Sequence, residues 1–365
     1  MKPILSPTDY CAVSVFEAEQ KTIFRSAWQF AGLVTQLSHH QDYLALNINR
    51  QPVILYNFQG ELRAFLNVCS HRFSRIRTDG KGNGPLQCQY HGWTYNIDGL
   101  PTGITNFPYF EHFKEERRCE LALERWQVET CGKLIFVRPD LSHSSLREHL
   151  GDAWESLQSM GEAFGEEMSC IRMTIRANWK VVLENTLESY HVRFVHPATF
   201  AQLEAKTQEY CYAGSNSSWY AAIKPSIGDG LAKLAKTLKL SYSPDGYFHQ
   251  FIFPTLTLAT TYGVSFSLQT IEPLDAETTA FTARVFTANI DEASSLKQKQ
   301  LRNLATMATD FNSQVFKEDK TICEEVQLGT AHASPMRNGE LSSEEQRVLA
   351  FQQAYAESMR TRTTV

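Results

Sequence analysis

Two short groups of cysteine and histidine lie sixteen residues apart and contain the residue types that bind iron or zinc. The first group is Cys69-x-His71 and the second is Cys88-x-x-His91. Thiolate and imidazole suit zinc as well as iron–sulfur centres. Zinc fingers usually pair cysteine with cysteine and histidine with histidine, whereas each group here supplies one residue of each type. Two such pairs on neighbouring hairpins can bring four ligands to one point.

The order of these ligands favours a Rieske [2Fe–2S] centre, in which two cysteines hold one iron and two histidines hold the other. The complete pattern, CxHR followed by CxxHGWxY and an Asp98-Gly99 turn, resembles the Rieske-type ring-hydroxylating oxygenases. The alternative is a chance grouping of buried cysteine and histidine, but four ligands, their order and the Gly92-Trp93 context would then have to coincide. Arg72 and Trp93 are expected to pack and hydrogen-bond around the cluster and to tune its potential.

A second set of ligand-type residues lies in ENTLESYHVRFVH, where His191 and His196 are five residues apart. A zinc-protease site requires histidines four apart, so this segment is not one. On a regular helix a separation of five turns two side chains ~140° out of line. Pro197 disfavours the α conformation at His196, so we expect the helix to end there, or to bulge, and to bring His196 back beside His191. A lone histidine is more often a satisfied core residue, but the Rieske pattern favours a metal site.

Two histidines and one carboxylate with open positions form the facial triad of non-haem Fe(II) oxygenases. The acidic candidates in VFKEDKTICEEVQLG are Glu318, Asp319, Glu324 and Glu325, and spacing alone does not choose among them. In the family that the Cys/His pattern resembles, the ligand is an aspartate at a fixed distance before V-Q-x-G, which implies Asp319. The alternative for Asp319 is a place on a solvated helix face.

Glu188 lies three residues before His191 and therefore ~60° away on the same expected helix face. The resemblance implies that this carboxylate bridges a Rieske histidine of one subunit and an iron-bound histidine of its neighbour. The carboxylate would fix the tautomer of each of these two histidines, and it would give the electron a short hydrogen-bonded route from the cluster to the iron. Aspartate is commoner at this position, and glutamate resembles the carnitine, choline and glycine betaine subgroup. An ordinary surface acid is the alternative. The resemblance also places Asn185 near the iron.

The segments around these ligands predict an α+β chain with an all-β part. Short alternating apolar runs separated by turns predict hairpins between residues ~40 and ~140. The strand-rich segment 247–290 and a final helix at 342–360 belong to an α+β part, and Ser342 with Glu345 fits a capping box. Further helices are predicted at 16–30, 144–167, 178–191 and 294–327.

Three domains are expected. They are an N-terminal helical segment at 1–39 that packs on the catalytic domain, the Rieske domain at 40–142 and the catalytic domain at 143–365. The resemblance implies that the catalytic domain has a helix-grip fold, which is an antiparallel sheet with a long C-terminal helix.

Composition excludes several classes of protein. The chain has 365 residues, 42% of them hydrophobic and 21% charged, as in globular proteins with a sizeable core. The net charge of −5 with scattered basic residues gives no footprint for nucleic acid. No apolar run approaches the ~18 residues of a membrane span, and no signal peptide is visible. We therefore expect a cytoplasmic protein with no membrane partner, whose eight cysteines are metal ligands or free thiols.

The resemblance implies the terminal component of an oxygenase system that uses O₂, mononuclear Fe(II) and electrons passed on by the Rieske cluster. Because the sequence has no G-x-G-x-x-G and no flavin motif, the electrons must come from a separate NAD(P)H-dependent reductase of the flavin or ferredoxin type. The family forms homotrimers, or trimers with an added small beta subunit. The non-enzyme alternative is a Rieske electron carrier with an appended binding domain, which lacks iron at His191 and His196.

Two classes of reaction stay open. One is monooxygenation, by hydroxylation or N-dealkylation, of a small substrate such as a quaternary ammonium compound, which Glu188 favours. The other is ring hydroxylation of an aromatic acid or hydrocarbon. A carboxylate substrate would need a basic residue in the pocket, for which Lys224 and Arg284 are candidates. Aromatic residues of the second half are expected either to line an apolar pocket or cation–π cage, or to fill the sheet core. These are Trp219, Tyr220, Tyr247, Phe248, Phe251, Phe253, Tyr262 and Phe266.

Overall fold

The computed structural model describes residues 1–365 except 111–112, 140–143, 291–294, 336 and 361–365. Contacts group the chain into two compact units, which we call the β unit (Arg25–His149) and the α+β unit (Met1–Phe24 with Leu150–Val365). The sequence had placed the divisions after residues 39 and 142. The first division differs because β1 (Gln29–Leu33) pairs with β9 (Leu134–Arg138) and so belongs to the sheet of the β unit.

The β unit contains an antiparallel sheet with the strand order β1-β9-β8-β4-β3-β2-β5 and a small β6–β7 hairpin. The remaining strands are β2 (Asp42–Ile48), β3 (Gln51–Phe58), β4 (Glu61–Leu66), β5 (Gly80–Asn83), β6 (Thr94–Tyr95), β7 (Pro101–Gly103) and β8 (Arg125–Cys131). Its short helical segments are η1 (Val34–Gln36), η2 (Phe107–Tyr109) and α4 (Glu115–Glu120), and α5 (Leu146–Leu150) lies at its end.

Strand β3 is buried on both faces, which explains its nearly continuous apolar sequence. Ile54 and Tyr56 pack in a cluster that includes Cys69 and Cys88. Their neighbours Val53 and Leu55 point to the opposite side, as alternation along a strand requires, and pack with Trp126. The two cysteines that were expected to bind metal therefore lie in one of the two apolar cores of this unit.

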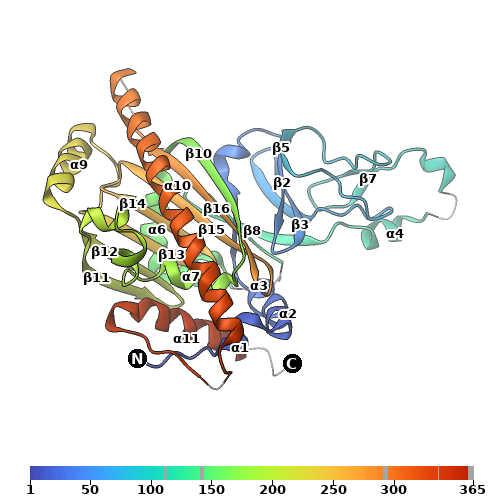
Figure 1. Ribbon diagram of the computed structural model, residues 1–365. Helices are drawn as coiled ribbons and strands as arrows, with labels where there is room; N and C mark the ends of the chain where they lie inside the picture. The colour runs from blue at the N-terminus through green and yellow to red at the C-terminus, as the bar shows by residue number, and fades with distance from the viewer. Residues whose placement is uncertain (111–112, 140–143, 291–294, 336, 361–365) are drawn as a thin grey trace. The chain divides into compact units, whose positions relative to one another are not determined.

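The α+β unit contains a second antiparallel sheet with the order β10-β16-β15-β14-β13-β12-β11 (Figure 1). Its strands are β10 (Phe164–Ile175), β11 (Lys206–Ala213), β12 (Asn216–Ala222), β13 (Tyr247–Ile252), β14 (Leu256–Thr261), β15 (Ser265–Asp275) and β16 (Thr278–Ala288). Its helices are α1 (Pro7–Cys11), α2 (Val13–Lys21), α6 (Trp154–Glu162), α7 (Trp179–Thr186), α8 (Val192–Val195), α9 (Pro225–Leu238), α10 (Ser295–His332) and α11 (Gln346–Arg360), with α3 (Ile23–Ser26) at the boundary. The 3-10 segments are η3 (Gly151–Ala153), η4 (Phe200–Leu203) and η5 (Ser343–Glu345).

Two groups of helices cover opposite faces of this sheet. The long helix α10 crosses β10, β16 and β15 (Figure 1). Trp179 of α7, Phe316 of α10 and Phe351 of α11 share one apolar core with the sheet residue Phe251. Helix α6 lies on the other face, because the side chain of Gln250 donates to the carbonyl of the residue before α6 at 3.3 Å. Since side chains alternate along β13, its odd-numbered residues face α7 and α10.

The expected α+β class, with an all-β unit and an antiparallel sheet carrying a long helix, is confirmed. Three local predictions were wrong at their ends. The helix expected at 16–30 ends at Ser26 and is followed by β1, and the helix expected at 178–191 ends at Thr186. The helix expected at 144–167 ends at Glu162, and β10 begins at Phe164. Across the residues that the structure describes, no helix combines the length and the apolar character needed to cross a membrane.

Candidate metal centres and adjoining cavity

The two Cys/His groups fold into loops with the same backbone pattern. We call them the cluster loops (Cys69–Ser74 and Cys88–Trp93). In each loop the cysteine N–H donates to the carbonyl five residues later, and the cysteine carbonyl accepts from the N–H four residues later, at 2.8 to 3.0 Å. That fourth residue is Phe73 in one loop and Gly92 in the other, with left-handed φ angles of 61° and 74°. The two loops therefore share a backbone turn, although the histidine follows the cysteine by two residues in one and by three in the other.

The cluster loops bring the four expected ligands together. Cys69 and Cys88 are buried in the same apolar cluster, and the ring centroids of His71 and His91 are 4.7 Å apart. His71 Nδ1 is one of the buried nitrogens that have no hydrogen-bond partner among the described residues. Because an unpaired buried polar atom is costly, this nitrogen indicates a ligand. Two thiols beside two imidazoles are the donor set of a Rieske cluster.

Of the two cluster-loop residues expected to surround the cluster, one lies where expected and the other does not. Trp93 stacks on His71 with centroids 4.8 Å apart and an interplanar angle of 8°, as packing around a cluster requires. Arg72, in contrast, is exposed and lies over the ring of Tyr90 at 5.8 Å. Sequence reasoning had not assigned a role to Tyr95, although it ends the CxxHGWxY pattern. The Tyr95 hydroxyl lies 3.0 Å from Cys69 Sγ, and burial raises the pKa of Tyr95, so the hydroxyl stays a donor.

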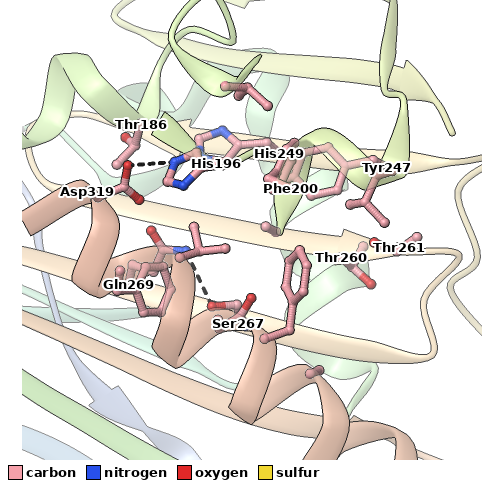
Figure 2. Close-up of a pocket in the computed structure, with 18 of the residues that line it drawn as sticks. Thr186, His196, Phe200, Tyr247, His249, Thr260, Thr261, Ser267, Gln269 and Asp319 are labelled. Carbon is pink, nitrogen blue, oxygen red and sulfur yellow. Dashed lines mark hydrogen bonds and ion pairs between the residues drawn. The ribbon is translucent and has the colours of Figure 1, made fainter. Parts of the chain in front are cut away.

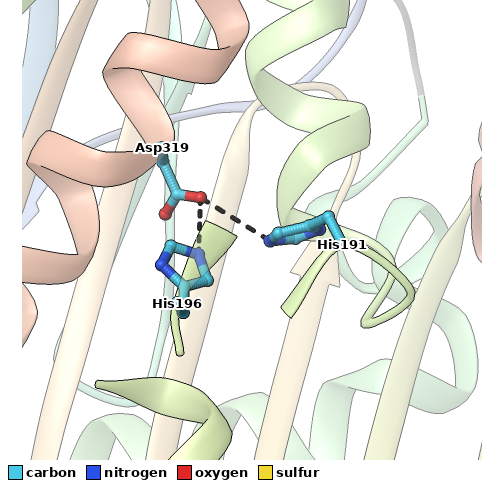
Figure 3. A group of neighbouring side chains, drawn as sticks. All are labelled: His191, His196 and Asp319. Atoms are coloured by element: carbon cyan, nitrogen blue, oxygen red, sulfur yellow. Dashed lines mark hydrogen bonds and ion pairs between the residues drawn. The ribbon is translucent and has the colours of Figure 1, made fainter. Parts of the chain in front are cut away.

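A second candidate centre is formed by His191, His196 and Asp319, here called the His–His–Asp group (Figure 3). One ligand atom from each residue lies within 4.8 Å of the others. Asp319 Oδ1 is 3.0 Å from His196 Nε2 and 3.6 Å from His191 Nε2. Two imidazole nitrogens and one carboxylate oxygen therefore converge from different segments, which matches the 2-His-1-carboxylate donor set.

The two histidines converge because the chain turns before the first of them as well as after the second. Helix α7 ends at Thr186, and His191 immediately precedes the one-turn helix α8. His196 follows α8 with φ −119° and ψ 44°, which is outside the α region. The predicted helix exit before Pro197 is thus present, whereas the single helix through Glu188 is not.

Each histidine of the group has a carboxylate on its other ring nitrogen. His191 Nδ1 is hydrogen-bonded to Glu188, which also accepts the backbone N–H of Tyr190. His196 Nδ1 donates to Glu318 Oε2 at 2.7 Å. Such contacts fix the tautomer and leave Nε2 free for a metal. Burial opposes protonation of His196, but Asp319 and Glu318 outweigh burial and raise its pKa.

The four acidic candidates on α10 have different surroundings. Asp319 points to the histidines and accepts the Asn185 amide at 2.7 Å. Glu318, one residue earlier, contacts the back of His196 and also accepts the Thr199 hydroxyl at 2.7 Å. Glu324 pairs with Arg176, at 3.2 Å, and Glu325 is exposed. Sequence reasoning had weighed Glu318 only as a metal ligand and missed its contact with Nδ1.

A cavity of about 170 Å³ adjoins the His–His–Asp group (Figure 2). Of the aromatic candidates, Trp219, Tyr247 and Phe266 line it, whereas Phe248, Phe251 and Phe253 are buried. Tyr220 and Tyr262 do not line this cavity. The lining also includes aromatic residues outside the strands, namely Phe200, Phe311 and Phe316.

Among the described residues, no lysine or arginine lines this cavity. The two basic candidates from the sequence lie elsewhere. Lys224 pairs with Glu204 at 2.6 Å, and Arg284 pairs with Glu167 at 2.7 Å. The side chains expected to meet a substrate carboxylate are therefore both engaged outside the cavity.

The chain matches two family models. The model of the ring hydroxylating alpha subunit (catalytic domain) covers residues 155–361, and the model of the Rieske [2Fe-2S] domain covers residues 27–114. The first match includes the His–His–Asp group, and the second includes both cluster loops.

Similar proteins and structures give the same picture. A carnitine monooxygenase oxygenase subunit from Acinetobacter pittii is 28% identical over 347 residues, which are 93% of this chain and 88% of that protein. A glycine betaine monooxygenase oxygenase subunit from Pseudomonas aeruginosa is 34% identical over 197 residues, 52% of this chain and 43% of that protein. The crystal structure of the quaternary ammonium Rieske monooxygenase CntA with an inhibitor aligns with a TM-score of 0.81 at 21% identity, over 98% of this chain and 95% of that one.

The residues present fit the cofactors of this family. The cluster loops offer two buried thiols and two imidazoles, one with an unpartnered nitrogen, to a [2Fe–2S] cluster. The His–His–Asp group offers two nitrogens, held by carboxylates, and one oxygen to a mononuclear iron that acts with O₂. The chain therefore belongs to the alpha subunits of the Rieske-type ring-hydroxylating oxygenases.

Proposed function

We propose that this chain is the terminal oxygenase of a system that mono-oxygenates a small quaternary ammonium compound. The observation that carries the proposal is the chemistry of the cavity beside the His–His–Asp group. Its wall combines the aromatic rings of Phe200, Trp219 and Tyr247 with carboxylates, and no lysine or arginine lines it among the described residues. Aromatic faces attract a desolvated organic cation, and quaternary ammonium groups are typical ligands of such walls.

The charges around the site support the same class of substrate. Asp319, Glu188 and Glu318 contact the ligand histidines, so three carboxylates face the two positive charges of an Fe(II) ion. A cation beside the filled site is then favoured electrostatically. The similarity to a carnitine monooxygenase subunit along 93% of the chain agrees with this reading.

When bound, the two iron groups supply the electron-transfer and O₂ chemistry of the family. The protein contributes position. Glu188 and Glu318 hold the two imidazoles in one tautomer, and the Asn185 amide fixes the Asp319 carboxylate by its 2.7 Å hydrogen bond. The apolar part of the cavity wall excludes water and places a methyl or methylene group of the substrate beside the His–His–Asp group.

The proposal includes partners. Electrons come from NAD(P)H through a separate reductase, and the oxygenase assembles as a homotrimer. Glu188 is proposed to bridge His191 and a Rieske histidine of the neighbouring subunit, which requires assembly for activity. The hydrogen bond between Glu188 and His191 Nδ1 supports the half of the bridge that lies within one subunit.

A substrate screen tests the function. Purified holoenzyme with a surrogate reductase is offered carnitine, glycine betaine, choline and benzoate, and NADH consumption is scored together with product. We expect product, with NADH use coupled to it, from at least one ammonium compound. Hydroxylation of benzoate with no product from any ammonium compound would refute the proposal in favour of ring hydroxylation.

A further inference from the structure

Arg347 is an unusual residue behind the cavity. It is 1% exposed, near the N-terminus of α11, and it forms no ion pair with any described residue. The positive end of a helix adds to the cost of burying a cation there. Its Nε donates to the Ser217 hydroxyl at 3.1 Å, and its Nη1 has no partner among the described residues. The charge of Arg347 is therefore uncompensated within the described part of the chain.

His249 connects this cation to the cavity. The ring is 4% exposed and lines the cavity from β13, in the same cross-strand row as Trp219, Ala259 and Ser267 (Figure 2). Arg347 Nη2 lies 3.1 Å from His249 Nδ1. Because a guanidinium can only donate, Nδ1 must accept, and the proton of the neutral ring must be on Nε2.

The donor on His249 has no partner in the protein. Nε2 is buried without a hydrogen bond to any described residue, and it lies on the side of the ring away from the nitrogen that contacts Arg347. Burial and the nearby Arg347 hold the pKa of His249 well below its usual value, so the ring stays neutral. A buried, unsatisfied N–H at a cavity wall indicates a ligand that accepts a hydrogen bond.

We propose that His249 donates its Nε2–H to an anionic group of the substrate, and that Arg347 acts behind it as a positioning residue. Arg347 fixes the tautomer of His249 and supplies the positive charge that a carboxylate would meet. Tyr247 also lines this wall, and no described residue is hydrogen-bonded to its hydroxyl, so this hydroxyl offers a second donor.

This inference rests on the proposed function and narrows it. A cavity with aromatic rings and carboxylates around the His–His–Asp group, and with His249 backed by Arg347, suits a zwitterion better than a simple cation. The predicted substrate class is a betaine, which carries a quaternary ammonium group and a carboxylate. A charge-assisted hydrogen bond to the carboxylate adds affinity that an alcohol cannot match.

Binding of matched pairs tests the inference. The holoenzyme is titrated by calorimetry without reductase, so that no turnover occurs. Glycine betaine and choline share the trimethylammonium group but carry a carboxylate and a hydroxyl, respectively. Benzoate and benzyl alcohol make the same comparison without the ammonium group. We expect the carboxylate of at least one pair to bind about 10- to 100-fold more tightly than its alcohol, as for a hydrogen bond to a charged group.

Variants assign the preference to residues. His249→Phe keeps a ring at this position but removes both nitrogens, and it is expected to abolish the preference for the carboxylate while leaving the alcohol's Kd nearly unchanged. His249→Gln retains one acceptor and one donor, and we expect it to restore most of the preference. Thr260→Val is the matched control, because Thr260 lines the cavity but its hydroxyl already donates to the Ser265 carbonyl at 2.6 Å. Arg347→Met should weaken binding of the carboxylate selectively.

The outcomes separate the two proposals. If only the benzoate pair binds and shows the His249-dependent preference, the ammonium function fails and the anion site stands. If both members of each pair bind equally in the parent enzyme, the anion site fails. It also fails if none of the four compounds binds, or if His249→Phe and His249→Gln weaken carboxylate and alcohol to the same extent, as a purely structural role would.

Discussion

The two metal centres of this chain are assembled in contrasting ways. The four residues proposed to hold the cluster lie between Cys69 and His91, on two turns with the same hydrogen-bond pattern. The His–His–Asp group instead joins residues 123 positions apart, from the α8 region and from the middle of α10. The first centre is preformed by local backbone geometry, whereas the second depends on how helices pack on a sheet. The two centres should therefore respond to different changes.

The largest expected effect separates the centres directly. His191→Ala removes an imidazole ligand, so we expect iron content to fall from about three to about two per chain. Turnover should fall by more than about 100-fold. Losing a residue that only supports a metal ligand costs up to about 100-fold, and losing the ligand itself should cost more. The Rieske absorbance should not change. His332→Ala, at an exposed histidine of α10, is the control, and full activity of His191→Ala would remove the His–His–Asp group from the mechanism.

The second change tests whether the two centres communicate through Glu188. Glu188→Gln removes a charge while both metal sites keep their ligands, so iron content should stay at about three per chain. Turnover should fall about 100-fold, because an uncharged amide no longer supports the imidazole N–H contacts on both sides. Rapid mixing of the reduced enzyme with O₂ and substrate should show a cluster that stays reduced. Glu325→Gln, at an exposed position, serves as the control, and a normal rate of cluster oxidation in Glu188→Gln would contradict the bridge.

A smaller effect is expected on the back of His196. Glu318→Gln can still accept the N–H of His196 but loses the charge, so iron at the His–His–Asp group should be held about 10-fold less tightly. Competition with a chelator measures this change, and the cluster should be unaffected. Glu324→Gln is the control. It makes the same substitution on the same helix, but Glu324 pairs with Arg176 and not with His196. Equal iron affinity in both variants would show that Glu318 does not support the centre.

Tyr95→Phe perturbs only the cluster loops. It removes a hydroxyl 3.0 Å from Cys69 Sγ, and a hydrogen bond to sulfur stabilises the reduced cluster. We expect the reduction potential to fall by on the order of tens of millivolts, measured by redox titration of the visible absorbance. Iron at the His–His–Asp group should stay bound. An unchanged potential would mean that the hydroxyl proton is not directed to the sulfur.

The smallest effect on activity is expected from a change at Glu184 on α7. This change should instead alter how the stability of the protein depends on pH. Burial raises its pKa to about 7, although Gln352 and Tyr10 donate to it. Because the folded pKa is above the unfolded one, its contribution to stability is complete below about pH 4 and is lost as pH rises through 7. The free energy of unfolding of the α+β unit should therefore fall by up to about 3 kcal/mol between pH 4 and pH 8. Glu184→Gln should flatten this profile, and a parallel slope in both proteins would contradict it.

The same contrast between local and long-range assembly explains which residues of the two centres could be predicted from the sequence. The cluster ligands follow from a local pattern, because both loops contain all the residues that define their turns. Two of the three His–His–Asp residues were likewise visible as a close pair. Asp319 came from the family's spacing rather than from chemistry, since Glu318 is adjacent and only ~100° away around α10.

Contacts between distant segments left weaker signals. Adjacent acids at 318 and 319 could have suggested one ligand and one support, because neighbouring helix positions point in different directions. His249 could have been predicted as a cavity residue from the alternation of side chains along β13. It lies two residues after Tyr247, which was already a candidate, and therefore on the same face of the strand. Arg347 gave no signal, since it lies 98 positions from His249 and only tertiary packing brings the two together.

The separation of His196 and Asp319 by 123 positions has a consequence for folding. An ion held between them closes a long loop of chain, whereas the cluster closes a short one, and long loops cost more entropy to close. Because a ligand that binds only the folded state stabilises it by mass action, iron occupancy and unfolding temperature should be linked in this protein. A preparation that is half loaded with mononuclear iron is then a mixture of two populations. The iron-free molecules should unfold at a lower temperature than the iron-bound ones, and the packing of α10 against the His191 and His196 segment should be lost first.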